Sequence, residues 1–200
     1  MKRIILILVL LMISYCFCDE FLIGKGNCQR YNSGNSSFYE DYYTLRLDDT
    51  YMMYYIVIHN NEYEITIHIN GLEINTLRKN LEKYFEWYSI AAENDATVMK
   101  ELPNSGISSF LSFMNGKKIK LTSMFQLSFY FFSQNILWHQ LVICSDDIPI
   151  LGTENEYIEL DKIYLDFNAA KLLFDLISED NVTLTKKEYY DNKKESELFN

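Results

Sequence analysis

Glu62, Glu64, Thr66 and His68 come closest, by type and spacing, to a reactive site in this sequence. They occupy alternate positions of EYEITIHI, and alternate side chains of a β-strand share one face. A carboxylate and an imidazole on one face could bind a metal ion or share a proton in acid–base catalysis. Glu64 and His68 are therefore candidate catalytic residues. Because no third ligand and no cleft is evident, a solvated outer sheet face is the favoured interpretation.

Other chemical signatures are missing from the sequence. It contains no G-x-S-x-G turn, no H-E-x-x-H motif, no S-x-x-K motif and no phosphate-binding loop. His59 lies beside a predicted turn and His139 lies inside WHQLVIC, so both are predicted to be structural. Trp87 and Trp138 are predicted core residues, although either could anchor a partner if its ring were exposed. We expect no metal and no cofactor.

The N-terminal segment has the pattern of a secretory signal. Lys2 and Arg3 precede an uncharged, mostly apolar stretch of 15 residues, 4–18, and charge returns at Asp19. In a helix this stretch would reach roughly 22 Å, short of the roughly 30 Å hydrocarbon core of a bilayer. A basic start, a short apolar core and small residues before a polar boundary predict a signal peptide over residues 1–18.

Two ways of processing this signal stay open. Cys16 and Cys18 are small enough for a signal peptidase to cut before Asp19, and this is the favoured route. The alternative is lipidation of Cys16, which the bulky Tyr15 disfavours. Both routes predict an exported protein that is periplasmic, attached to the cell surface or secreted, and lipidation would add a membrane anchor.

Two cysteines, Cys28 and Cys144, would remain after removal of residues 1–18. In an oxidising compartment they could form one disulfide, and the chain-entropy model assigns about 4–5 kcal/mol to so long a loop. Cys144 ends the apolar run LVIC and could equally be a small buried hydrophobic residue. The sequence leaves both alternatives open.

The chain is acidic. Its formal net charge is −10 at pH 7, and loss of Lys2 and Arg3 would leave 16 basic against 28 acidic side chains, a net charge of −12. Such a surface repels nucleic acid and anionic membranes, so neither is expected as a partner. It would attract a basic protein or peptide, although solubility alone explains the same charge.

Alternating residues predict strands in the first half of the chain. YYTLRL predicts a first strand, after an irregular leading segment CQRYNSGNSSFYED. MMYYIVI and YEITIHI predict a hairpin around Asn60 and Asn61, with Val57 facing Glu64. The predicted core face of this hairpin carries Met52, Tyr54, Ile56, Ile58, Tyr63, Ile65, Ile67 and Ile69.

The spacing then changes to that of a helix. Apolar residues at three- and four-residue steps predict a long amphipathic helix over about 75–102. FLSFM and KKIKL predict a hairpin with an Asn-Gly turn, and QLSFYFF and LWHQLVIC predict two more strands. YIEL and KIYL predict a last short strand or pair. FNAAKLLFDLIS predicts a shorter C-terminal helix, about 167–178, capped by Asp166 or Asn168.

These elements together predict an α+β fold. A meandering, mostly antiparallel sheet of about six to seven strands would carry the long amphipathic helix on its apolar face. We expect one globular domain over residues 19–184 and a disordered charged tail over residues 185–200. The sequence makes no prediction of the oligomeric state.

The sequence has many patterns that predict strands and helices but few motifs of reactive residues, which favours a non-catalytic function. We expect an exported binding or interaction module whose acidic, tyrosine-rich surface meets a basic protein or peptide; an inhibitor or immunity protein would be one form. The alternative is a small exported hydrolase that uses Glu64 and His68, with or without a metal. An enzyme needs these side chains to converge in a pocket, whereas a binding module needs an accessible aromatic and acidic surface.

Overall fold

The computed structural model describes residues 19–59, 64–115, 118–135, 137–153, 156–158 and 160–197. The predicted signal segment with Cys16, the predicted turn at Asn60 and Asn61, and Glu62 lie outside these ranges. Within the described part of the chain, no helix is both long and apolar enough to cross a membrane.

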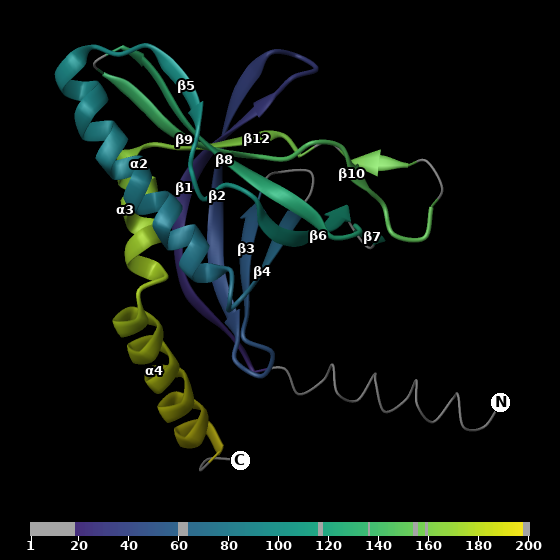
Figure 1. The fold of residues 1–200 in the computed structure, drawn as a ribbon. Helices are drawn as coiled ribbons and strands as arrows, with labels where there is room; N and C mark the ends of the chain where they lie inside the picture. Colours follow the sequence, from purple (N-terminus) through teal and green to yellow (C-terminus); the bar gives the residue numbers. More distant parts are fainter. Residues whose placement is uncertain are drawn as a thin grey trace.

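Ten strands form one antiparallel sheet, and eight of them close into a barrel (Figure 1). Around the barrel, neighbouring strands follow the order β8 (Phe125–Asn135), β9 (Trp138–Cys144), β12 (Lys162–Leu165), β1 (Glu20–Asn32), β2 (Ser37–Asp48), β3 (Met53–His59), β4 (Glu64–Asn70) and β6 (Ile107–Asn115). The barrel closes where β6 pairs with β8, with Ile107 opposite Leu127. The predicted meandering sheet of six to seven strands is therefore wrong.

Two short strands pair with the strands at which the barrel closes. β5 (Val98–Glu101) pairs with β8, and β7 (Lys118–Leu121) pairs with β6. A separate ribbon of β10 (Ile148–Pro149) and β11 (Tyr157–Ile158) projects beside β7 (Figure 1). A bridge between Thr122 and Ile150 joins this ribbon to the segment that follows β7.

β1 was not predicted from the sequence. It pairs with β2 from Glu20 opposite Asp48 to Asn32 opposite Ser37, so the predicted irregular leading segment is one long hairpin. Two glycines hid it, because glycine is uncommon inside strands. Gly26 is needed here for close packing: a Cβ atom would lie 2.5 Å from the ring of Tyr43.

The first helix is shorter than predicted. α2 covers Ile74–Asn94 and ends at Asp95, whose φ of 48° is left-handed. Val98 and Met99, predicted to continue the helix, belong instead to β5. Their apolar spacing fits a helix, but pairing with β8 decides their conformation.

The C-terminal region contains two helices. α3 (Phe167–Leu176) confirms the prediction, and Asp166 caps it by accepting a hydrogen bond from Ala169 N over 2.7 Å. α4 (Glu179–Glu197) occupies most of the segment predicted to be disordered. In Figure 1 the helices lie along one side of the barrel.

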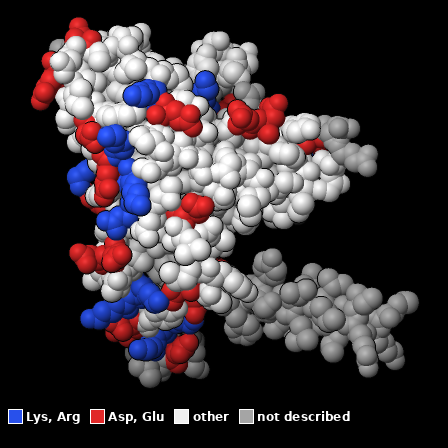
Figure 2. Space-filling view, in the orientation of Figure 1, with Lys and Arg blue, Asp and Glu red and all other residues white. Residues whose placement is uncertain are grey.

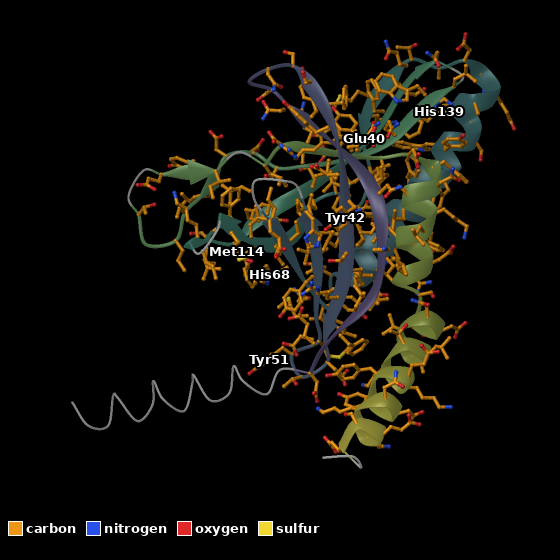
Figure 3. All side chains as sticks on the ribbon, turned by 180° about the vertical axis from the view of Figure 1, so that it is seen from behind. Glu40, Tyr42, Tyr51, His68, Met114 and His139 are labelled. Atoms are coloured by element: carbon orange, nitrogen blue, oxygen red, sulfur yellow. The ribbon has the colours of Figure 1, made fainter. Side chains whose placement is uncertain are left out.

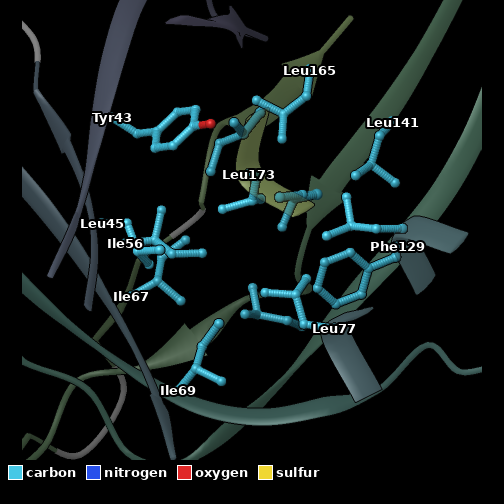
Figure 4. Packing of buried hydrophobic residues seen from close by; sticks show 14 of the residues in the cluster. Tyr43, Leu45, Ile56, Ile67, Ile69, Leu77, Phe129, Leu141, Leu165 and Leu173 are labelled. Carbon is cyan, nitrogen blue, oxygen red and sulfur yellow. The ribbon is translucent and has the colours of Figure 1, made fainter. Parts of the chain in front are cut away.

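The core lies inside the barrel, on the side covered by α2 and α3 (Figure 4). The predicted core residues Ile56, Ile58, Ile65, Ile67 and Ile69 are all buried there. Leu77 of α2 and Leu173 of α3 complete the packing from the helices. Met52 was predicted wrongly: it is 50% exposed and lies in a turn at φ 50°, because β3 begins one residue later.

Candidate functional site

A cleft opens in the barrel wall where β12 ends. β12 pairs with β1 only at residues 29–31 and with β9 only at residues 141–143. β12 lies between β9 and β1 in the sheet. Beyond Leu165 the chain leaves the sheet and starts α3, so β12 no longer fills the space between β1 and β9 there. The resulting β1–β9 cleft has a volume of about 390 Å³.

Carboxylates, amides and aromatic rings line the β1–β9 cleft. The polar lining residues are Asn27, Gln29, Glu40, Gln140, Asp166 and Asn168. Trp138 and Tyr164 form its aromatic wall, and Cys28, Ala169 and Leu172 complete the lining. In β1 and β2 the ladder places Gln29 opposite Glu40, so both side chains share the outer face. In Figure 3 Glu40 lies on this hairpin, well away from His68.

Gln140, one of the lining residues, carries an unpaired polar atom. The residue is only 5% exposed, and its Oε1 has no hydrogen-bond partner among the residues that the structure describes. A buried acceptor without a donor costs about 1–3 kcal/mol. A ligand with a suitable N–H or O–H group would remove that cost.

The aromatic wall of the β1–β9 cleft is held rigidly. The Trp138 ring packs at 90° against Phe132, with 5.4 Å between ring centroids. Phe38 packs edge-on against both Trp138 and Tyr164, at 6.1 and 5.1 Å. Trp138, predicted as a core residue, is thus a half-buried wall of the cleft, and Trp87 packs against the core as predicted.

Cys28 and Cys144 are both free thiols in the structure. Cys28 lies on the inner face of β1. Arg30, two residues further along and on the same face, pairs with the core residue Ile163 of β12. Ile163 faces Ile143, so Cys144, one residue further along β9, points to the outer face. Burial, and then the nearby charges of Asp41 and Glu40, raise the pKa of the Cys28 thiol to about 12. This thiol is therefore neutral and unsuited to nucleophilic attack.

Glu64 and His68 do not converge. They are four residues apart on β4, which separates them by about 13 Å along the strand. Glu64 instead accepts from His59, with 3.0 Å between Oε2 and Nδ1, and His59 Nε2 lies 3.0 Å from Thr44 Oγ1. Glu64, His59 and Thr44 thus follow the order carboxylate, imidazole and hydroxyl that is found in a catalytic triad. Thr44, however, lies in mid-strand, paired on both sides, so the surrounding backbone N–H groups form ladder bonds rather than an oxyanion hole.

His68 is enclosed by other side chains. Its ring stacks on Phe110 at 4.1 Å, and Tyr55 meets it edge-on at 4.9 Å. Its Nε2 lies 3.0 Å from Ser112 Oγ. Burial lowers the pKa of His68 to about 4, so the imidazole is neutral at pH 7. His139 is also buried, with Nδ1 2.9 Å from Ser133 Oγ, in the structural role that the sequence indicates.

Over the ranges that the structure covers, no three His, Cys, Asp or Glu residues gather as a metal site requires. The chain matches no family model, no curated protein and no solved structure. Its function is therefore inferred from the chemistry of its own sites.

The β1–β9 cleft could not be found from sequence motifs. Its lining comes from β1, β2, β9, the end of β12 and α3, and each segment contributes one or two ordinary polar residues. One signal was readable in the sequence: Asp166 was one of the two residues, with Asn168, that were predicted to cap the C-terminal helix. The second readable signal was Trp138, which was predicted to anchor a partner if its ring were exposed. A half-buried tryptophan is a common anchor for ligands.

Proposed function

We propose that this chain is an exported, non-catalytic module that binds a basic protein or peptide through the β1–β9 cleft. The observation that carries the proposal is the lining of the cleft. Among the described residues it includes Glu40 and Asp166 but no Lys or Arg, together with aromatic rings and an unpaired amide oxygen. Such a surface attracts cations and offers hydrogen-bond acceptors to them. An inhibitor or immunity protein toward a basic enzyme would be one form of this module.

The distribution of charge supports the same function. Figure 2 shows that, on the face in view, Lys and Arg gather mainly along the column of helices, beside Asp and Glu. The net charge of −10 would steer a basic partner toward the chain. The alternative hydrolase gains no support from Glu64 and His68, which lie in different surroundings.

Binding can be tested by co-purification with matched variants. The full chain is recovered from the cells that make it, together with the double variant Glu40→Gln, Asp166→Asn and the control Glu82→Gln, whose carboxylate is exposed on α2 away from the cleft. We expect mass spectrometry to identify a basic protein that wild type and control retain and the double variant loses. Equal recovery with the double variant would contradict the proposal.

Export can be tested on the same material by intact mass. A chain beginning at Asp19 is expected, with both Cys28 and Cys144 as thiols. A chain beginning at Cys16 with added acyl mass would indicate the lipid-anchored alternative. Retention of residues 1–18 would refute the exported part of the proposal.

A further inference from the structure

We infer that the β1–β9 cleft takes a guanidinium group, the side chain of an arginine that the basic partner presents. This inference rests on the proposed function and names the group that the cleft recognises. The volume of the cleft, about 390 Å³, lies near the lower end of the roughly 300–1,000 Å³ of ligand pockets. It therefore has room for one long side chain rather than for a folded segment.

The two carboxylates leave acceptor oxygens for such a ligand. Glu40 Oε1 accepts from Gln29 Nε2 over 2.6 Å, and Asp166 Oδ1 accepts from Ala169 N. Each carboxylate thus keeps a second oxygen that has no hydrogen-bond partner in the described part of the chain. These two oxygens, on β2 and at the end of β12, come from different walls of the cleft.

The positive charges near the cleft do not neutralise it. Arg30 points to the inner face and is bound by Asp41 and Asp161. Lys25 lines the neighbouring hollow, which meets the cleft at Asn27 and Leu172, but it is not part of the cleft lining. A cationic ligand would therefore supply the charge that the lining lacks.

A guanidinium fits this set of acceptors better than an ammonium. It is planar and has five N–H donors in fixed directions, whereas an ammonium has three on a flexible stem. Gln140 also lines the cleft, and its buried Oε1 has no hydrogen-bond donor among the described residues. Trp138 and Tyr164 offer aromatic surfaces, on which guanidinium groups stack. Asn80 Oδ1 and Ser145 Oγ are also buried without a partner, but neither residue lines the cleft.

The inference can be tested with Trp138 as the reporter. The chain has two tryptophans, so Trp87→Phe leaves Trp138 as the source of indole fluorescence. This full-length variant is titrated with acetyl-arginine methylamide, with the lysine analogue, and with the citrulline analogue, which has the shape of arginine without its charge. We expect saturable binding of the arginine compound and at least tenfold weaker binding of the other two.

Cleft variants complete the test. Glu40→Gln and Asp166→Asn should each weaken arginine binding about tenfold, whereas Glu82→Gln should leave it unchanged. Asn also caps helices, so Asp166→Asn retains α3, and far-ultraviolet circular dichroism checks that each variant folds. Equal affinity for the citrulline analogue or the lysine analogue would overturn the inference.

Failure of the inference can be distinguished from failure of the proposed function. If the arginine compound does not bind but the co-purified basic protein is still lost on Glu40→Gln, Asp166→Asn, the cleft binds its partner through another group. If neither the compound nor a basic protein depends on these carboxylates, both proposals are refuted.

Discussion

Arg30 and Asp41 form a buried ion pair across β1 and β2, with 2.8 Å between Nε and Oδ2. Their side chains are only 8% and 6% exposed, and Arg30 also donates to Asp161, which precedes β12. One arginine thus ties together three segments beside the β1–β9 cleft. The inner face of the long hairpin is polar at this end, where the apolar core stops.

Loss of this arginine should destabilise the fold strongly. Arg30→Gln would remove the cation that the buried Asp41 and the partly buried Asp161 share, so we expect the free energy of unfolding to fall by about 3 kcal/mol. Arg46→Gln is the matched control, since Arg46 pairs with Glu20 at 3.1 Å with side chains 41% and 38% exposed. That change should cost less than about 1 kcal/mol. Urea denaturation measures the loss of unfolding free energy in both variants. Equal losses would show that burial does not make the Arg30 ion pair more important than the exposed one.

The stability of the chain should fall in mild acid because of His68. Its pKa is about 4 in the folded chain against 6.5 for an unperturbed histidine, so below pH 6.5 the unfolded state binds the proton more readily. The stabilising contribution is complete above pH 6.5 and is lost as the pH falls toward 4. We expect about 2 kcal/mol from this group, allowing for its partial exposure.

His68→Phe removes the titrating group while keeping an aromatic ring beside Phe110 and Tyr55. Denaturation between pH 7.5 and 4 should show a shallower loss of stability for this variant than for wild type. An unchanged pH dependence would show that His68 is not responsible.

A methyl group at Gly26 should disturb the packing of β1. The Cβ atom would meet the end of the Tyr43 ring at 2.5 Å, and this ring is held because its hydroxyl donates to Ala169 O over 3.2 Å. We expect Gly26→Ala to lower the unfolding free energy by about 1–3 kcal/mol. Gly34→Ala, in the exposed turn between β1 and β2, should change it by less than about 1 kcal/mol. Thermal unfolding of the two variants checks the contrast.

α4 should be the least stable helix of the described chain. None of its residues is buried. It contacts the barrel through the ring of Tyr189 on Phe21, at 5.1 Å, and the ion pair of Lys186 with Asp49, at 2.7 Å. Tyr190 and Lys193 add polar contacts with Asp19. Tyr189→Ala should therefore accelerate amide exchange over residues 180–197 and cost about 1 kcal/mol in global stability. Tyr157→Ala, an exposed tyrosine on β11, is the control. Unchanged exchange in α4 would show that other contacts hold the helix.

Some features could be predicted because they depend on local spacing. The core face of β3 and β4 was predicted correctly although its register was not: Val57 lies opposite Thr66 rather than Glu64. A shift of two residues keeps every side chain on its face, because the strand period is two. The helix cap was predicted as Asp166 or Asn168, and the structure shows Asp166; the prediction could be made because capping involves only the residues that follow the cap.

Other features contradicted their local signals. Val98 and Met99 have helical spacing but lie in β5, because β8 provides hydrogen-bond partners there. The charged C-terminal segment lacks apolar residues for a core, yet α4 forms where Tyr189 and Lys186 can contact the barrel. The pairing of β3 with β4 also places His59 beside Glu64, a contact that the predicted register did not give.

The sequence by itself determined which residues are apolar on each strand and helix, and it determined the acidic charge that favours a basic partner. Closure of the barrel was decided only by the tertiary structure, because it depends on β6 meeting β8 and on β1 lying between β2 and β12. The β1–β9 cleft follows from the same long-range pairing: β12 is short, so the wall separates beside Gln140 and Asp166. Local periodicity specifies the face that a side chain occupies, but not the distant strand beside which that face will lie.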